Sequence, residues 1–277
     1  MKIAVIGDDA YLAQGLAQVF NDDQITNFPR IDLMENVKEL KDFDVVINFT
    51  LQPAFSKQIL PNDQLIDGQI ASVLAGSNTK LVMLSSRKVY GSYPDSVLLS
   101  ERDQLNPVDF YAKNKAAAEK IVSEKLPDQH LIVRIANILD VPTERKSYKT
   151  FIGWISEQIF NSGFLSVTEN RQVKKDFISR DYFHQALHDL IKKDAKGIIN
   201  IGSGFALPIE LVLTKIVGKR NIRFAENEPP ARDQFILNVE KLHQYTKPFS
   251  KKDLDTVCSK ANLFLSKHKK GFQNVKD

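Results

Sequence analysis

The chain begins with MKIAVIGDDAYLAQGLAQVF (residues 1–20), in which a short apolar run precedes Gly7 and apolar residues at helical spacing follow it. The pattern predicts a strand over residues 2–6 and a helix that passes through Leu16 and Phe20. A strand, a glycine and an amphipathic helix are how a dinucleotide-binding βα unit begins. The turn after the first strand is therefore a candidate phosphate-binding turn.

Short apolar, β-branched runs alternate with helical patterns along most of the chain. We expect further strands at residues 24–28, 45–49, 80–84, 130–135 and 197–201, and helices at 63–75, 109–125 and 181–191. Continuous apolar runs of strand length are typical of strands that are buried on both faces of a parallel sheet. The alternation predicts an α/β fold with a Rossmann-type, doubly wound parallel sheet.

The alternation loosens after Asn137, which suggests a second region. We expect residues 1–145 to form a dinucleotide-binding Rossmann domain to which residues 173–202 return. Residues 146–172 and 203–277 are expected to form a smaller, mixed substrate-binding region at the C-terminal side. Ligands of open α/β sheets bind outside the carboxyl ends of the strands, so the residues that follow each strand are the ones to inspect.

The composition limits the class of protein. The chain has 277 residues, 43% hydrophobic and 26% charged, with a net charge of +4. Its basic residues are spread out, so we expect no nucleic-acid partner. No apolar run is long enough to span a membrane and the N-terminus leads straight into a strand, so we expect a cytoplasmic protein without a membrane partner. The one cysteine, Cys258, can form no intrachain disulfide, and His184 and His188 lack a third ligand, so we expect no metal site.

Candidate catalytic residues follow the strand at 80–84. The sequence SSRKVYG occupies residues 85–91, and Tyr111 and Lys115 lie near the start of the helix at 109–125. Residues four apart share one face of a helix. A neighbouring ammonium group favours the phenolate form and lowers the pKa of a phenol, which makes tyrosine a usable acid and base near neutral pH. By itself the Tyr–Lys spacing also fits a surface pair; a serine at the preceding strand end favours the catalytic interpretation.

The order of these blocks resembles the extended short-chain dehydrogenase/reductase family, in its nucleotide-sugar epimerase, dehydratase and reductase group, over residues 1 to about 205. Ser86 stands where that family places its catalytic serine, 25 residues before Tyr111 (111 − 86). Three further blocks resemble the family: Arg-Ile-Ala-Asn at 134–137, Lys-Asp-Phe-Ile at 175–178 and Asn-Ile-Gly-Ser-Gly at 200–204.

The resemblance implies that a hydride passes between a nicotinamide cofactor and a carbon of a sugar. Tyr111 would give or take the proton on the sugar oxygen, Ser86 would orient that oxygen, and Lys115 would tune Tyr111 and hold the nicotinamide ribose. Among the substrate contacts, Asn137 would face the substrate phosphates. Lys175 would grip the nucleotide diphosphate or be a plain surface charge.

The same two alternatives apply to Arg232, in the loop Pro-Pro-Ala-Arg-Asp at 229–233. The resemblance therefore predicts substrate-binding residues at Ser86, Asn137, Lys175 and Arg232.

The glycine-rich turn of the family is altered in this chain. Gly7, Ala10 and Ala13 occupy its three glycine positions, so two methyl groups are added where the backbone approaches a pyrophosphate and where helix meets strand. Asp8 and Asp9 add negative charge, which would cap the expected helix and interact with its dipole. The expected cofactor-binding residues are Gly7, Ala10, Tyr11, Leu12, Arg30, Thr50, Tyr111 and Lys115.

The cofactor is expected to be NADP or NAD. The acidic residue that would bind a ribose 2′-hydroxyl should follow the turn by about 20 residues. Arg30 lies there instead, and an arginine suits a 2′-phosphate, which favours NADP. Arg30 as a solvent-facing loop residue is the alternative.

Residues beside the serine distinguish the activities of the family. Members that remove water from the sugar carry an Asp-Glu pair there, whereas this chain has Arg87 and Lys88, so a dehydratase is disfavoured. The resemblance implies an NAD(P)H-dependent ketoreductase for a nucleotide-activated 4-keto-6-deoxy sugar, as in lipopolysaccharide or capsule biosynthesis. A nucleotide-sugar 4-epimerase with tightly held NAD and a non-catalytic NAD(P)-binding protein stay open. A homodimer is a further expectation from the resemblance.

Overall fold

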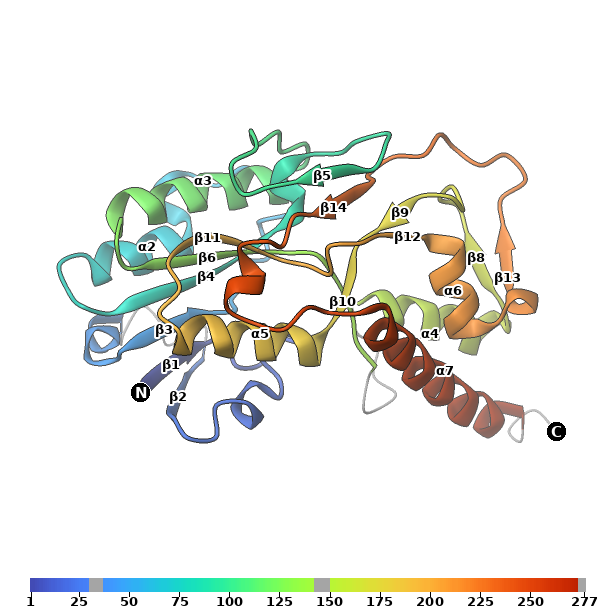
Figure 1. Cartoon of the computed structure of the whole chain (residues 1–277), viewed down its shortest axis with the longest axis horizontal. Helices are drawn as coiled ribbons and strands as arrows, with labels where there is room; N and C mark the ends of the chain where they lie inside the picture. The colour runs from blue at the N-terminus through green and yellow to red at the C-terminus, as the bar shows by residue number, and fades with distance from the viewer. Residues whose placement is uncertain (30–36, 142–149, 274–277) are drawn as a thin grey trace.

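The centre of the molecule is a parallel β-sheet (Figure 1). The computed structural model describes residues 1–29, 37–141 and 150–273. Six strands form the sheet in the order β11-β6-β4-β3-β1-β2, and every neighbouring pair is parallel. Their bounds are β1 Lys2–Ile6, β2 Gln24–Phe28, β3 Val45–Asn48, β4 Lys80–Ser86, β6 His130–Ile135 and β11 Gly197–Ile201. The predicted α/β, Rossmann-type sheet is confirmed.

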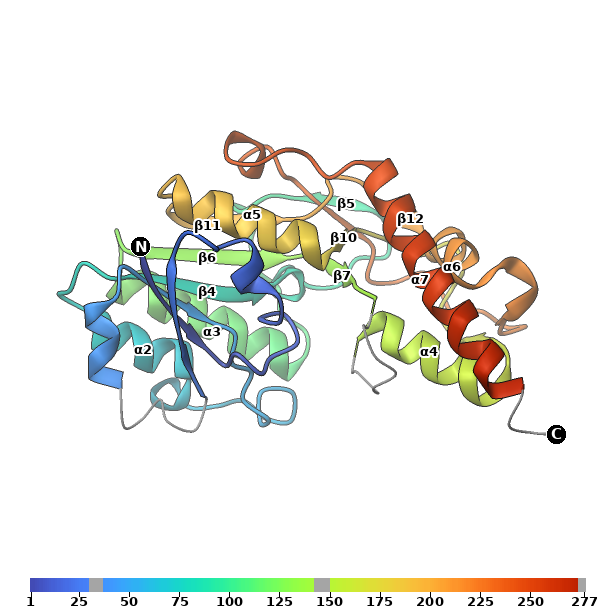
Figure 2. The same cartoon turned by 90° about the horizontal axis from the view of Figure 1, so that it is seen from below.

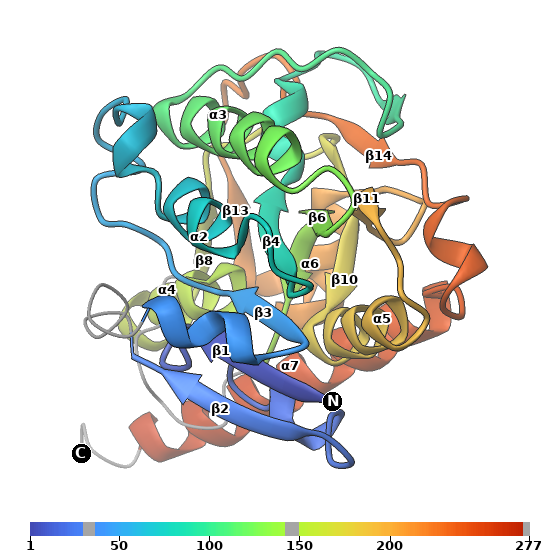
Figure 3. The same cartoon turned by 90° about the vertical axis from the view of Figure 1, so that its left-hand side faces the viewer.

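The sheet is covered on both faces, which explains its continuous apolar runs. Figure 3 shows α2 (Ile66–Leu74) and α3 (Phe110–Lys125) on one face and α5 (Arg180–Lys192) on the other. Every residue of β3 and of β6 is buried, because alternate side chains enter two separate hydrophobic clusters. Such strands have no solvent-facing side, so no polar alternation is found in their sequence.

The predicted helix through Leu16 and Phe20 is wrong. The connection from β1 to β2 consists of turns and one short 3₁₀ helix, η1 (Leu16–Gln18). Gly15, directly before η1, has φ +85°, a left-handed conformation that an α-helix cannot contain. Asp8 and Asp9 are exposed, and the turns that follow them give them no α-helix to cap.

Backbone hydrogen bonds within successive turns, together with tertiary contacts, hold this connection. Arg180 donates from Nη1 to the carbonyl oxygen of Tyr11 at 3.2 Å. The Nε2 atom of His184 lies 2.8 Å from the carbonyl oxygen of Leu12. Both contacts come from α5, so the loop after β1 is fixed by the helix on the neighbouring face of the sheet.

The order of the strands places a ligand-binding position at the end of β1. The chain passes from β1 to β2 on one side and returns to β3 on the other side of β1. Such a reversal opens a crevice at the carboxyl ends of the two central strands. The loops that begin at Gly7 and at Phe49 border this crevice.

A second group of elements lies beyond the carboxyl ends of the strands, around α4 (Phe151–Ser162), α6 (Ile209–Val217) and α7 (Lys251–Gln273) (Figures 1 and 2). Two-stranded pairs accompany them: β7 (Asn137–Leu139) with β10 (Phe177–Ser179), β8 (Leu165–Val167) with β13 (Ile222–Phe224), β9 (Lys174–Lys175) with β12 (Leu207–Pro208), and β5 (Val97–Leu99) with β14 (Phe235–Leu237). Short 3₁₀ helices are η2 (Val37–Asp42), η3 (Asn62–Gln64), η4 (Arg87–Tyr90), η5 (Lys219–Asn221) and η6 (Leu242–Gln244). In the described part of the chain, no helix combines the length and apolarity that a membrane span requires.

Candidate active site

The two serines at the end of β4 point in opposite directions, as successive strand residues do. Ser85 is buried and donates a hydrogen bond to the Glu119 carboxylate. Ser86 is only half-buried, and its Oγ accepts from the backbone N–H of Lys88 at 3.3 Å, which caps η4. The serine that the sequence selects is therefore the one of the pair that is accessible at the carboxyl edge of the sheet.

Tyr111 and Lys115 lie on one face of α3 and pack on the same aromatic ring. The rings of Tyr111 and Phe55 are 6.4 Å apart between centroids, and Lys115 Nζ lies 5.4 Å from the centroid of Phe55. Lys88 Nζ lies 5.9 Å from the Tyr111 ring and pairs at 2.8 Å with Asp109, the N-cap of α3. This contact brings the turn that carries Ser86 to the start of the helix that carries Tyr111.

A buried polar network supports the serine turn from behind. Arg134 on β6 makes a two-pronged ion pair with Glu119 on α3, with Nη2 2.7 Å from Oε2, and stacks on the Tyr90 ring at 4.8 Å. Tyr90 donates to Asn200 Oδ1 at 2.7 Å, and burial raises the pKa of Tyr90 to about 12. Ser85 adds its hydrogen bond to Glu119. Three of the sequence blocks thus meet in one network.

Asp176 anchors the loop after β11. Its side chain is fully buried and accepts from Ser203 N at 2.9 Å, Ser203 Oγ at 2.6 Å and Leu237 N at 3.1 Å. Burial raises the pKa of Asp176 to about 6, and these hydrogen bonds partly offset the rise. The carbonyl oxygen of Asp176 accepts from Asn137 Nδ2 at 3.0 Å, so the same residue orients the asparagine that the family resemblance selects.

The turn after β1 retains two features of a dinucleotide site. Gly7 has φ +75°, and a Cβ atom there would lie 2.9 Å from Thr50 Oγ1. Thr50 Oγ1 is buried and has no hydrogen-bond partner among the described residues. The glycine lets a ligand approach the backbone closely, and the hydroxyl beside it lacks a partner. Both features fit a polar ligand at the end of β1, where the order of the strands reverses. The residues at this end of the crevice therefore fit a dinucleotide, although no α-helix N-terminus is present to receive its phosphates.

The predicted cofactor residues Ala10, Tyr11 and Leu12 follow in the same loop, where they pack against other parts of the protein. The hydroxyl of Tyr11 donates a hydrogen bond to the Asp140 carboxylate, and burial raises the pKa of Tyr11. Ala10 and Leu12 are half-buried in the loop. Arg30 lies outside the described residues, so its proposed contact with a 2′-phosphate is not placed.

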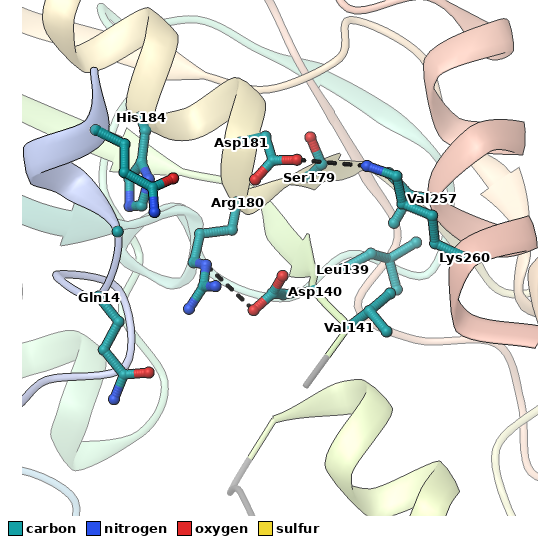
Figure 4. A pocket seen from close by; sticks show the side chains of 12 residues that line it. Gln14, Leu139, Asp140, Val141, Ser179, Arg180, Asp181, His184, Val257 and Lys260 are labelled. Atoms are coloured by element: carbon teal, nitrogen blue, oxygen red, sulfur yellow. Dashed lines mark ion pairs between the residues drawn. The ribbon is translucent and has the colours of Figure 1, made fainter. Parts of the chain in front are cut away.

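A cavity of about 290 Å³ lies between the loop after β1, α5 and α7 (Figure 4). Arg180 pairs with Asp140 in it, with Nε 3.2 Å from Oδ2. Arg180 also covers the Tyr11 ring, with the guanidinium carbon 5.1 Å from the centroid. Tyr11, Asp140 and Arg180 therefore join the β1 loop to the chain that follows β7 and to the start of α5.

A second cavity, of about 340 Å³, is lined by Asn137, Ile138, Phe151, Glu169, Lys175, Phe177 and Ile209. Lys175 Nζ lies 2.9 Å from Glu169 Oε1 and 3.1 Å from Asp233 Oδ2. Arg87 makes a two-pronged ion pair with the same Asp233 and lies 4.4 Å over the Phe235 ring. The structure thus brings Lys175 to the cavity but supplies it with two carboxylate partners.

The centre of this cluster is occupied by Asp233 and not by the preceding residue, Arg232. Arg232, the residue that the sequence selects, is exposed, whereas Asp233 is half-buried and has φ +58°. Burial opposes ionisation of Asp233, but Arg87 and Lys175 outweigh it and lower the pKa of this carboxyl. A substrate phosphate at Lys175 would meet an ionised carboxylate already bound there.

Sequence reasoning missed the acids that pair with the motif residues. Asp67 on α2 lies 3.5 Å from Lys115, Glu119 holds Arg134 and Asp233 holds Arg87. Each stands in a helix or loop where an acidic residue is ordinarily exposed. For Asp67, one signal was available: the apolar neighbours Ile66, Ile70 and Leu74 place it on a short, otherwise buried helix.

One protein-family model matches part of the chain. The model of the RmlD substrate binding domain matches residues 63–174, which contain Ser86, Tyr111, Lys115 and Asn137. No curated protein sequence matches the chain. The match to the RmlD model confirms the resemblance to the extended short-chain dehydrogenases that act on nucleotide sugars.

Solved structures agree with this fold. A UDP-N-acetylglucosamine 4-epimerase from Methanobrevibacter ruminantium has a TM-score of 0.80 at 17% identity, covering 96% of this chain and 98% of that one. A dTDP-glucose 4,6-dehydratase from Bacillus anthracis, in complex with NAD, has a TM-score of 0.78 at 17% identity, covering 100% of both chains. A dTDP-4-dehydrorhamnose reductase from Clostridium acetobutylicum has a TM-score of 0.73 at 15% identity, covering 96% of this chain and 100% of that one. An epimerase, a dehydratase and a reductase thus share the fold, which leaves the reaction type to the residues of the site.

Proposed function

We propose that the chain reduces the keto group of a nucleotide-activated 4-keto-6-deoxy sugar with NADPH or NADH. The observation that carries the proposal is the placement of Ser86, Tyr111 and Lys115 at the carboxyl edge of the sheet. The Lys88–Asp109 pair joins the serine turn to α3, and Phe55 packs on both Tyr111 and Lys115. Gly7 and Thr50 follow the carboxyl ends of β1 and β3 in the same sheet.

The proposed chemistry assigns one step to each side chain. The bound dinucleotide supplies the hydride that the keto carbon receives. The Tyr111 hydroxyl donates the proton that the same carbonyl oxygen needs, so that an alcohol results. Lys115 favours the phenolate that this transfer leaves on Tyr111, and Ser86 donates a hydrogen bond that orients the substrate oxygen.

The proposed binding residues lie on two sides of this centre. Gly7 allows the cofactor to approach the end of β1, and Thr50 offers it an unsatisfied hydroxyl. Asn137 and Lys175 would contact the substrate diphosphate in the second cavity, where Asp233 has to give up part of its contact. The proposal also includes three further parts. They are a division into a Rossmann domain and a substrate-binding region, a homodimer, and a role in surface-polysaccharide synthesis.

The residues beside Ser86 support reduction over dehydration. Arg87 is buried and held by Asp233, and Lys88 is paired with Asp109. Neither can serve as the carboxylic acid or the carboxylate base that elimination of water requires. A 4-epimerase would use the same serine, tyrosine and lysine, and only cofactor turnover separates it from a reductase.

The test is titration with NADPH and NADH, followed by an assay with a panel of 4-keto-6-deoxy nucleotide sugars. We expect stoichiometric oxidation of the cofactor, and a fall of about 10²–10⁴-fold in kcat for Tyr111→Phe with cofactor binding retained. Tyr245→Phe, after η6, is the matched control. Protein that retains NAD and interconverts epimers without net oxidation would be an epimerase. Cofactor binding without any turnover would identify a non-catalytic binding protein.

A further inference from the structure

Asp8 lies where the ends of two neighbouring strands meet. It is the second residue after β1, and the backbone N–H of Gly7 before it donates to the carbonyl oxygen of Phe28, the last residue of β2, at 3.0 Å. β1 and β2 run side by side in parallel, with Val5 paired to Asn27 (Figure 3). Asp8 therefore stands at the carboxyl edge of the sheet, beside the end of β2 as well as that of β1.

A cavity of about 190 Å³ lies at this point. Asp8 lines it from the end of β1, Asn27 lines it from the end of β2, and Gly15 and Leu16 line it from the turns after β1. Asp8 and Asn27 are both exposed, so a ligand can reach them. A cavity of about 150 Å³ can hold a benzene ring, so this one has room for a five-membered sugar ring. Of the described residues that line the cavity, Asp8 is the one acid and none is basic.

The cavity adjoins the part of the crevice that fits a dinucleotide. Gly7, directly before Asp8, approaches Thr50, whose buried hydroxyl has no partner among the described residues. In dinucleotide-binding folds, an acidic residue near the end of the second strand accepts a hydrogen bond from the 2′-hydroxyl of a ribose. The described end of β2 offers no acid, since Asn27 and Phe28 stand there. Asp8 brings a carboxylate to the same place from the neighbouring strand.

We propose that Asp8 is a specificity-determining residue, which accepts hydrogen bonds from the hydroxyl groups of the adenosine ribose and makes the chain select NADH over NADPH. The inference rests on the proposed function, which leaves the choice between the two cofactors open. A carboxylate has only acceptor sites, which match two neighbouring hydroxyl donors. A 2′-phosphate in the same place would bring acceptors and like charge against Asp8. The proposal therefore opposes the expectation of NADP from Arg30, which lies outside the described residues.

The first test is cofactor binding, measured by calorimetry without a sugar substrate. We expect the parent protein to bind NADH at least about ten-fold more tightly than NADPH, because hydrogen bonds to a charged acceptor are strong. Asp8→Ala should reduce that preference by at least about ten-fold. Asp9→Ala removes the same charge from the next residue, which does not line the cavity, and should keep the preference within about two-fold. Thermal melts check that both variants of exposed residues keep the parent fold.

The second test addresses the contact with the ribose itself. NADH in which hydrogen replaces the 2′-hydroxyl of the adenosine should bind the parent protein about ten-fold more weakly than NADH does. Asp8→Ala should bind the two dinucleotides alike, because the acceptor is gone. A loss of affinity that persists in Asp8→Ala would show that another group holds the hydroxyl, and would overturn the proposal.

The outcomes separate this inference from the proposed function. A parent protein that prefers NADPH and reduces a keto sugar would overturn the role of Asp8 alone. A preference for NADH that Asp8→Ala leaves unchanged, or that Asp9→Ala reduces equally, would do the same. The expected binding pattern without reduction of any keto sugar would support the role of Asp8 while the proposed function fails. Binding of neither dinucleotide would overturn both.

Discussion

Substitution of Asp176 by asparagine should make the stability of the protein less dependent on pH. The carboxyl group is fully buried beneath the loop after β11, and burial raises its pKa from 3.8 to about 6. In the unfolded chain the same group is hydrated and has its ordinary pKa. The folded state therefore binds this proton more tightly than the unfolded state does.

The sign and the size of the effect follow from this difference. A raised carboxyl pKa means that folding is most favourable while Asp176 is neutral, below about pH 4, and less favourable as the pH rises from about 4 to about 6. Two pKa units correspond to about 3 kcal/mol, at 1.36 kcal/mol per unit. An asparagine side chain at this position is neutral at every pH, so the variant avoids this loss. Relative to the parent, Asp176→Asn should gain about 3 kcal/mol between pH 4 and pH 7.

The amide of Asp176→Asn also changes the hydrogen bonds, and this changes the free energy of unfolding by an amount that does not depend on pH. Asp176 accepts from Ser203 N, Ser203 Oγ and Leu237 N, and an asparagine NH₂ group must face one of these donors. Leaving a buried donor without an acceptor costs about 1–3 kcal/mol. This cost lowers the free energy of unfolding of the variant by the same amount at every pH, so the slope against pH is unchanged.

Urea unfolding of both proteins at pH 4.5, 5.5, 6.5 and 7.5 measures the effect. Asp253→Asn is the control of opposite sign. Hydrogen bonds from the side chain and the backbone of Ser250 lower the pKa of Asp253, so its contribution is lost only as the pH falls below about 4. The difference between parent and Asp253→Asn should therefore be flat over this range. A flat difference for Asp176→Asn as well, or one that grows in favour of the parent as pH rises, would refute the reasoning.

Two further substitutions test the loop after β1 and the charge cluster. Gly7→Ala should lower the free energy of unfolding by about 2 kcal/mol, because φ is +75° and the new Cβ would lie 2.9 Å from Thr50 Oγ1; a stability equal to that of the parent in thermal melts would contradict this turn geometry. Asp233→Asn should lower KM for a nucleotide diphosphate sugar by up to about ten-fold, with a stronger salt dependence, since it frees positive charge on Arg87 and Lys175; a raised KM in steady-state assays would show that Asp233 itself aids binding.

The sheet was predictable because its strands obey one rule. β6 spans His130–Ile135 and β11 spans Gly197–Ile201, the bounds that their apolar runs indicate. A strand buried on both faces is mostly apolar, so the local sequence carries most of the signal. The exceptions are paired, as Arg134 of β6 is with Glu119. The helix α3 was predictable for a similar reason, since Asp109 caps it and Leu126 and Pro127 follow its end.

The connection after β1 was not predictable, because its conformation depends on distant residues. The apolar spacing of Ala13, Leu16 and Phe20 is helical, and all three side chains are indeed buried. Turns bury them equally well, and one of the contacts to these turns comes from Arg180, 169 residues after Tyr11. A hydrophobic pattern specifies which side chains face the core and does not determine the hydrogen bonds of the backbone.

In the candidate site too, the spacing of residues within one helix was predictable, whereas contacts between distant residues were not. The spacing of Tyr111 and Lys115 within one helix is local and was available from the sequence. Asp233 pairs with Arg87 across 146 residues. Asp67 pairs with Lys115 across 48. Such pairs form only when the topology joins their elements, so periodicity cannot indicate them.

These partners change what the candidate site demands of its ligands. In most dinucleotide folds, a helix N-terminus after the first strand supplies positive potential for the cofactor phosphates. Here that connection is made of turns, and Asp8 and Asp9 in it are exposed. On the proposed substrate side, Asp233 already compensates Lys175 and Arg87. In the proposed function, an anionic substrate has to bring enough other contacts to displace Asp233, which would favour a large ligand that reaches Ser86, Asn137 and Lys175 over a simple phosphate.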